Sequence, residues 1–350
     1  MRFLIDLFLA LVLVALFFFG LGFMLPSTAH VERSILIERP PIHVYDMVNN
    51  LARFPEWSAL TSVDANVKFI PGTQLKGPGA RMDWESTAPK VGNGYVEIVG
   101  GEDLKGVGYK LYLSAQNQGS SRMIVAPQEF GVKATWGFDV DFGSNVIQRY
   151  KGLYLDSAVG DTLHLSMLRL KYLLENNAYA RDYSDIEIEE KELVAGPALQ
   201  ITATAKCYAE EGEDTCTPDI PTERAVAMKE LTDFIAKNKL NATGSPQYML
   251  VSKEPYTVTF DVLIPVDRND AKTSGRIQAV QTYGGKVIAG LHEGFRDNTV
   301  PTWEKVMAYM TVHGLKPVEG MPGRQIDEYI SDPATTEAQF FHTNVYQPVQ

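Results

Sequence analysis

Two stretches decide the fold of the first half of the chain: VKATWGFDV at residues 132–140 and DSAVGDTLHLSMLRLKYLL at residues 156–174. The first alternates apolar and polar side chains, as in a strand with one buried face. The second follows an Asp-Ser pair suited to an N-cap and repeats apolar residues at steps of three and four, as in an amphipathic helix. Glycine-punctuated β segments precede both stretches between residues 80 and 126. We therefore predict an α+β domain with an antiparallel sheet around one helix.

The length and charge of the chain narrow the classes of function. Its 350 residues are 45% hydrophobic, enough for about two domains with real cores. Asp and Glu total 43 against 32 for Lys and Arg, which gives a net charge of −11. Such a balance is poorly suited to neutralising a run of phosphates, so we do not expect nucleic acid as a partner. The sequence leaves protein partners unknown.

An uncharged apolar run, LFLALVLVALFFFGLGFML, occupies residues 7–25. As a helix at ~1.5 Å per residue it covers about 28 Å, close to the thickness of a bilayer core. Arg2 stands before it, and positive charge marks the cytoplasmic side. Residues 1–29 are thus expected to anchor the chain in the inner membrane, with the soluble domains in the periplasm. The alternative is a secretory signal cleaved near Ala29, which would release the chain into the same compartment.

The first domain, residues 30–180, carries four longer motifs. They are VERSILIERPPIHVYDMVNNLARFPEWS (31–58), GPGARMDWES (77–86), ATWGFDVDFG (134–143) and YKGLYLDSAVGDTLHLSMLRLKYLLE (150–175). Together they resemble the START-related SRPBCC, or polyketide-cyclase-like, family. That resemblance implies a helix-grip fold with a cavity for lipids, polyketides or other apolar molecules. By position, the side chains expected around such a cavity are Trp57, Trp84, Trp136, Phe138 and Met167. The alternative is that they fill a solid core, because pockets and cores have the same lining.

The second domain, residues 186–350, contains an internal duplication. A helix at 222–237 is followed by GSP (244–246) and VLIPV (262–266). A second helix, from residue 301 to about residue 314, is followed by GMP (320–322) and VYQPV (345–349). Each copy is predicted to be a strand-helix-strand-strand unit. Two such units can place their sheets side by side and leave a groove along the pseudo-dyad, where ligands tend to bind.

Several motifs of this domain resemble the gyrase-inhibitor-like (GyrI-like) effector-binding family. They are FDVLIPV (260–266), YGGKVIAGLHEGF (283–295), TWEKVMAYM (302–310), IDEYISDP (326–333) and TNVYQPV (343–349). The resemblance implies a groove for small, often cationic or aromatic molecules, with an acidic residue two positions before the motif tyrosine. That residue is Asp327 here, where the family usually has the longer glutamate.

Around Asp327 we expect a ring of aromatic side chains that supply apolar and cation–π contacts. These residues are Tyr283, Phe295, Trp303 and Tyr329. In the alternative, Asp327 is a solvated acid on an edge strand.

Catalytic and metal-binding motifs are missing from the sequence. The histidines are too dispersed for a metal cluster, and no nucleotide-binding, dinucleotide-binding or serine-hydrolase motif occurs. We therefore expect neither a metal nor a cofactor. His292 and Glu293, beside the expected groove, are the best candidates for a general base, although a buried histidine more often serves a structural role. Cys207 and Cys216 bracket a polar stretch and form either a disulfide or two separate thiols.

These observations favour a non-enzymatic protein that is anchored in the membrane and binds, carries or senses small apolar or amphipathic molecules. The alternative is an enzyme, either of the polyketide cyclase and dehydratase type or a small-molecule hydrolase, which both resemblances allow.

Overall fold

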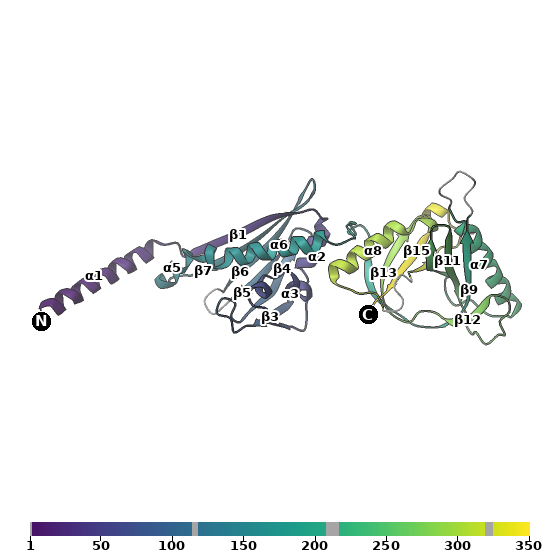
Figure 1. The fold of residues 1–350 in the computed structure, drawn as a ribbon, viewed down its shortest axis with the longest axis horizontal. Helices are drawn as coiled ribbons and strands as arrows, with labels where there is room; N and C mark the ends of the chain where they lie inside the picture. The colour runs from purple at the N-terminus through teal and green to yellow at the C-terminus, as the bar shows by residue number, and fades with distance from the viewer. Residues whose placement is uncertain (1, 114–117, 208–216, 319–324) are drawn as a thin grey trace. The chain divides into compact units, whose positions relative to one another are not determined.

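The computed structural model describes residues 2–113, 118–207, 217–318 and 325–350. The chain is an α+β protein with two antiparallel sheets. It divides into two compact units, residues 1–180 and residues 181–350, which we call unit 1 and unit 2 (Figure 1).

Unit 1 begins with a long apolar helix, α1 (Arg2–Met24). Its segment Phe3–Met24 has a mean hydropathy of 2.8, and every residue of it except Gly22 is exposed. By length and composition it is the one helix in the described part of the chain that is able to cross a membrane. At ~1.5 Å per residue these 22 residues extend about 33 Å, slightly more than a bilayer core.

The body of unit 1 is a seven-stranded sheet in the order β1-β7-β6-β5-β4-β3-β2. The strands are β1 (Thr28–Ile37), β2 (Lys68–Pro71), β3 (Arg81–Glu85), β4 (Gly94–Glu102), β5 (Gly106–Tyr112), β6 (Gln118–Gln128) and β7 (Gly131–Asp141). All neighbouring pairs are antiparallel. The strand predicted from residues 132–140 is confirmed, since alternate side chains of β7 are buried along it.

The helices of unit 1 follow the sheet connections. They are α2 (Pro41–Val48), α3 (Phe54–Trp57), α4 (Leu60–Val63), α5 (Val146–Gly152) and α6 (Asp161–Glu175), with a 3₁₀ turn, η1 (Leu51–Arg53), and a π turn, η2 (Asp156–Gly160). The predicted N-cap at Asp156 and Ser157 was wrong. Leu155 already has helical backbone angles and makes no side-chain cap, so no extended residue precedes the helix. Asp156 instead accepts a hydrogen bond from Arg33 over 2.8 Å.

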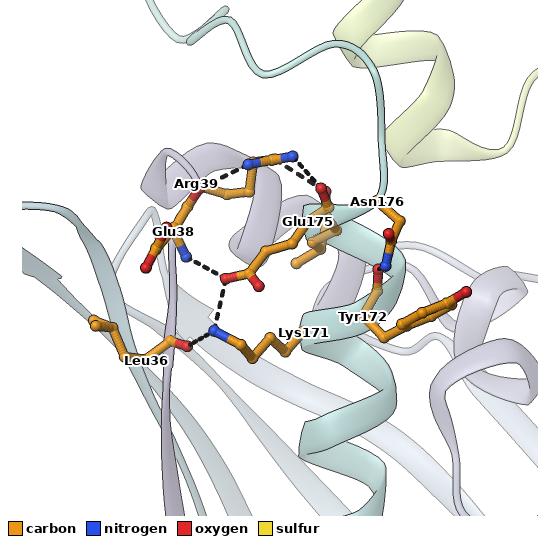
Figure 2. A network of polar contacts seen from close by, with 8 residues as sticks. Leu36, Glu38, Arg39, Lys171, Tyr172, Glu175 and Asn176 are labelled. Atoms are coloured by element: carbon orange, nitrogen blue, oxygen red, sulfur yellow. Dashed lines mark hydrogen bonds and ion pairs between the residues drawn. The ribbon is translucent and has the colours of Figure 1, made fainter.

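Arg39, just after β1, closes the C-terminal end of α6 (Figure 2). Its Nε donates to the Leu174 carbonyl over 3.0 Å, and its Nη2 donates to the carbonyls of Glu175 and Asn177. The last carbonyls of a helix have no partner within the helix, so a charged donor that reaches several of them both satisfies and stabilises that end.

The Glu175 carboxylate ties the same helix end to β1 (Figure 2). Its Oε1 accepts the Glu38 backbone N–H over 2.7 Å and the Lys171 ammonium over 2.8 Å. Lys171 also donates to the Leu36 carbonyl over 2.7 Å. Burial raises the pKa of Glu175, but the two donors outweigh burial and hold it below its ordinary value. The carboxylate is therefore the form that this network favours.

Unit 2 is built on an eight-stranded sheet in the order β12-β9-β11-β10-β14-β15-β13-β8. The strands are β8 (Ile188–Leu193), β9 (Pro197–Lys206), β10 (Gln247–Glu254), β11 (Thr257–Pro265), β12 (Ile277–Gln281), β13 (Gly285–Glu293), β14 (Ile326–Tyr329) and β15 (His342–Pro348). The helices are α7 (Ile220–Lys237) and α8 (Val300–His313), with 3₁₀ turns η3 (Arg296–Asn298) and η4 (Ala338–Phe340).

The strand order of unit 2 is symmetric about the β10–β14 pair. One half contains β9, α7, β10 and β11, and the other contains β13, α8, β14 and β15, so each half is a strand, a helix and two strands. α7 packs on β9 and β11, whereas α8 packs on β13 and β15. At the junction, Tyr248 of β10 lies opposite Asp327 of β14. The surface above that junction lies between the two halves.

Replacing Arg39 by alanine should lower the free energy of unfolding of unit 1 by about 2 kcal/mol, because the hydrogen bonds of a charged group to three carbonyls are lost. Urea titration of the full chain in detergent, followed by tryptophan fluorescence, measures this change, since Trp57, Trp84 and Trp136 all lie in unit 1. Arg122→Ala, at an exposed position of β6, is the control and should change stability by less than about 0.5 kcal/mol. Equal losses in both variants would contradict the capping role.

Candidate functional site

A cavity of about 420 Å³ opens above the β10–β14 junction of unit 2. We call it the junction cleft. Its walls come from the start of α7, strand β10, η3 and the start of α8, and strand β14. The side chains that matter most are Arg224, Tyr248, Arg296, Trp303, Asp327 and Tyr329. Ligand cavities of small molecules typically have volumes of ~300–1,000 Å³, so the junction cleft is large enough for one.

Arg224 reaches the cleft because the start of α7 is fixed in place. Asp219 caps the helix by accepting the Thr222 N–H over 3.1 Å, and Pro221 lies in the first turn. The Arg224 guanidinium donates to the Tyr329 hydroxyl over 3.0 Å and to the Asp297 carboxylate over 2.8 Å. This cation therefore bridges α7, η3 and β14, and only one of its partners is charged.

Arg296 brings a second guanidinium to the same ring. Its Cζ lies 4.7 Å from the centroid of Tyr329 and 4.4 Å from that of Phe341, and the Cζ of Arg224 lies 5.3 Å from the Tyr329 centroid. Arg296 also donates to the Ser331 carbonyl. Burial lowers its pKa, but an arginine keeps its charge near neutral pH. Two cations thus share one aromatic ring in a partly buried place.

Asp327 lines the junction cleft but is already engaged by neighbouring donors. It is 5% exposed. Its Oδ1 accepts the Trp303 indole N–H over 2.9 Å and its Oδ2 accepts the Thr299 hydroxyl over 3.1 Å. Burial raises its pKa to about 6, although the two hydrogen bonds and Arg224 oppose the shift. This carboxyl group is buried, accepts a hydrogen bond at each oxygen and has a pKa not far below neutral pH. It therefore offers little to an incoming cation.

The charge balance of the junction cleft is consequently positive. Arg224, Arg296 and Lys253 line it, against Asp297, which pairs with Arg224, and the buried Asp327. Guanidinium groups bind carboxylates, sulfonates and phosphates through paired N–H donors. The walls formed by Tyr248, Trp303 and Tyr329 add flat apolar surface. The geometry therefore suits an anionic group attached to an apolar or aromatic body.

Two of the aromatic residues expected around Asp327 lie elsewhere. The Tyr283 hydroxyl donates to the Lys286 carbonyl over 3.3 Å, and Tyr283 packs against an apolar cluster that includes Met249 and Ile326. These two residues alternate with Tyr248 and Asp327 and so lie on the other face of the sheet. Phe295 is 61% exposed, and its carbonyl accepts hydrogen bonds from His292 and from the Asn298 N–H. Trp303 and Tyr329 are brought together with Asp327.

His292 and Glu293 border a different hollow, next to Asp185 and Lys305. Burial lowers the pKa of His292, which favours the neutral ring. Its Nε2–H then donates to the Phe295 carbonyl over 3.2 Å, and its Nδ1 accepts from the Thr302 hydroxyl over 2.9 Å. Both ring nitrogens are therefore engaged within the fold: one joins β13 to α8, and the other joins it to the residue before η3. Glu293 is exposed at the end of β13.

The aromatic residues singled out in unit 1 lie deep in its interior. Trp57, Trp84, Trp136, Phe138 and Met167 are each at most 4% exposed. The ring centroids of Trp57 and Trp136 are 5.3 Å apart, and Phe54 lies 5.0 Å from Trp57 and 6.1 Å from Trp84. These are the edge-to-face and stacked contacts of packed rings.

The disulfide predicted between Cys207 and Cys216 involves a residue outside the described ranges. Cys207 itself follows β9. Among the described residues, no group of three or more His, Cys, Asp or Glu side chains is arranged to hold a metal ion.

Sequence reasoning missed the two arginines and Tyr248. Arg224 lies on a helix and Arg296 follows a strand, and single arginines at such places are usually solvated. The available signal was that Arg296 and His292 are close in the sequence to each other and to the second copy of the duplicated unit. No local pattern indicates that α7 and η3 meet at the ring of Tyr329.

The sequence matches no protein-family model and no curated protein. Comparison with solved structures finds several with low identity. A chain described as an EcmrR–DNA complex in EcmrR-RPo has 13% identity and a TM-score of 0.40 and is matched over 59% of this chain and 72% of that one. The EcmrR C-terminal domain has 12% identity and a TM-score of 0.37, over 47% and 98%. A hydrolase encoded by lin2189 from Listeria innocua has 14% identity and a TM-score of 0.35, over 47% and 92%.

The expectation that net charge excludes nucleic acid was wrong. The first of these structures is itself a complex with DNA. Net charge is a sum over the whole chain, whereas contacts to DNA use a local set of side chains on one surface. A total of −11 therefore does not decide whether nucleic acid is a partner.

The buried Asp327 should make unit 2 less stable as the pH rises. Its pKa is about 6 in the folded protein and about 4 in an unfolded chain, so folding favours the protonated form and this contribution is lost between these values. The free energy of unfolding, relative to that of Asp327→Asn, should fall by on the order of 1–3 kcal/mol from about pH 4 to about pH 7.

Urea titration with hydrogen-exchange mass spectrometry measures this difference for unit 2 alone. Asp270→Asn, an exposed position, is the control and should track the wild type at every pH. A constant difference between the wild type and Asp327→Asn over the whole range would show that folding does not raise the pKa of Asp327.

Proposed function

We propose that this chain is a membrane-anchored binding protein that senses a small amphipathic molecule in the junction cleft. The observation that carries the proposal is the pair of guanidinium groups of Arg224 and Arg296 on the ring of Tyr329, in a cavity of about 420 Å³. The ligand class that fits is an anionic group, a carboxylate, sulfonate or phosphate, on an apolar or aromatic body.

The electrostatics favour an anion over the cation that the GyrI-like resemblance implies. Bringing a cation next to two guanidinium groups costs repulsion in a site that is shielded from water. The one buried acid, Asp327, already has a donor at each oxygen. An anion would instead gain charge-assisted hydrogen bonds from N–H groups that are held in place by Tyr329, Asp297 and Ser331.

The ligand is placed in unit 2 because of how the aromatic residues of each unit are arranged. In unit 1, Trp57 and Trp136 contact one another, as they would in a filled core. In unit 2, Trp303 and Tyr248 line the junction cleft. The START-like resemblance remains the only support for a carrier role of unit 1.

The membrane location is supported by α1 and its flanks. The helix is long and apolar enough to span a bilayer, and Arg2 precedes it. By the positive-inside rule the rest of the chain is then outside the cytoplasm, in the periplasm if the membrane is an inner membrane. Cleavage near Ala29 would leave the same units in the same compartment.

The catalytic alternative has less support from the arrangement of side chains. His292 and Glu293 do not line the junction cleft, and both ring nitrogens of His292 are hydrogen-bonded within the fold. A general base must reach the proton that it removes. Binding without turnover is therefore the function that we propose.

Three probes of equal size and different charge test the proposal: naphthoate, naphthamide and naphthylmethylammonium. With the full chain in detergent, calorimetry should show the tightest binding for naphthoate. Arg296→Gln should weaken naphthoate at least about tenfold, which corresponds to ~1.4 kcal/mol, and should change naphthamide little.

Arg268→Gln is the matched control, because Arg268 is half-exposed and lies outside the cleft. It should bind all three probes like the wild type. Preference for the ammonium probe, or equal affinity for all three in wild type and Arg296→Gln, would overturn the assignment of an anionic ligand.

A further inference from the structure

The short helix α5 lies against the last turns of α1. The ring of Tyr150 stacks on Phe18, with centroids 4.1 Å apart and planes 8° apart, and its hydroxyl donates to the Phe18 carbonyl. Gly22 makes this approach possible, since a Cβ there would come within 2.3 Å of the Val146 side chain. α5 is therefore packed directly on the helix that we propose as the membrane anchor.

Arg149 of α5 also closes the end of α1. Its Nη1 donates to the carbonyls of Phe23 and Leu25 over 3.3 and 3.2 Å, and its other nitrogens donate to Gly143. The last turn of α1 contains no basic residue of its own. Carbonyls at the end of a membrane helix need donors where water is scarce, and α5 supplies them.

Beyond these contacts, α5 and the turn after it expose large apolar side chains. Ile147 is 58% exposed, Leu153 is 62% exposed and Tyr154 is 68% exposed. Ile147 and Lys151 are four residues apart and so share one face of the helix. Apolar side chains, a tyrosine and a lysine on one short element are the composition of segments that lie in a membrane interface.

The position along α1 sets the depth of this surface. Phe18 lies six residues before Met24, which is about 9 Å along a helix. If α1 crosses the bilayer, its end lies close to the headgroups, because α1 is only slightly longer than the hydrocarbon core. A group stacked on Phe18 then lies in the upper part of the acyl region.

We propose that residues 146–154, which we call the foot, insert into the surface of the same lipid bilayer that α1 spans. Ile147, Leu153 and Tyr154 enter the upper part of the acyl region, and Lys151 stays at the level of the lipid phosphates. This proposal rests on the proposed anchoring by α1. A bilayer is the occupant because the apolar surface of the foot is continuous with the exposed apolar surface of α1.

Tryptophan quenching by brominated lipid tests the foot. Leu153→Trp is placed in the full chain, which is reconstituted in phosphatidylcholine vesicles brominated either near the headgroup end of the acyl chains, to report on residue 153, or near their methyl end, to report on the middle of the bilayer. The four native tryptophans are buried, so they contribute little quenching. The new tryptophan should lose most of its emission relative to unbrominated vesicles.

Two further variants calibrate the result. Leu13→Trp, in the middle of α1, reports whether α1 is in the bilayer. Phe130→Trp is a matched exposed control at 73% exposure. It follows β6 at the far end of β7 from Asp141, about 33 Å away along the strand, and it should not be quenched.

The outcomes separate the two proposals. Quenching at residues 13 and 153 but not at residue 130 supports the foot. Quenching at residue 13 alone would contradict insertion of the foot and would still support the anchoring by α1. A tryptophan at residue 153 whose emission is blue-shifted but not quenched would mean that a second protein copy covers it. If the tryptophan at residue 13 is not quenched, both the proposed anchoring by α1 and the proposed insertion of the foot are contradicted. Adding Gly22→Leu, which forces α5 away from α1, should abolish quenching at residue 153 and retain it at residue 13.

Discussion

The function proposed for this protein depends on one antiparallel contact, between β10 and β14. Tyr248 opposite Asp327 is the place where the two halves of unit 2 become a single sheet. Because the strand order is symmetric about this pair, the starts of α7 and α8 lie on either side of it. The side chains of Arg224 and Trp303 can then both line the junction cleft. Without this pairing the halves would have no shared surface and no cleft.

Burial above that contact changes the chemistry of the residues. Burial raises the pKa of the Asp327 carboxyl group to about 6, although the hydrogen bonds from Trp303 and Thr299 oppose this shift. Arg224 and Arg296 keep their charge because guanidinium groups remain protonated even when partly buried. Burial thus makes the carboxyl group a weaker acid, whereas the two guanidinium groups keep their charge in spite of burial. This asymmetry turns a groove expected for cations into one better suited to anions.

In unit 1, the tryptophans singled out from the sequence are buried among other aromatic rings. Trp57 and Trp136 meet edge to face, and Arg39 and Glu175 fasten the end of the long helix to β1. Apolar periodicity cannot distinguish a filled interior from a hollow one, since both bury the same side chains. The contacts of α1 with α5 likewise join segments more than a hundred residues apart in the chain.

Local spacing along the chain was enough to predict the alternation of β7, the helical repeat of α6, the strand-helix-strand-strand duplication and the apolar run of α1. These follow from the fixed periods of strands and helices. The folded arrangement alone shows that Arg224 and Arg296 meet at Tyr329, that Tyr283 packs on the other face of the sheet, and that both ring nitrogens of His292 are engaged within the fold. Such contacts depend on strand order and burial, which bring together residues that are far apart in the chain. They produce no periodic pattern in the sequence.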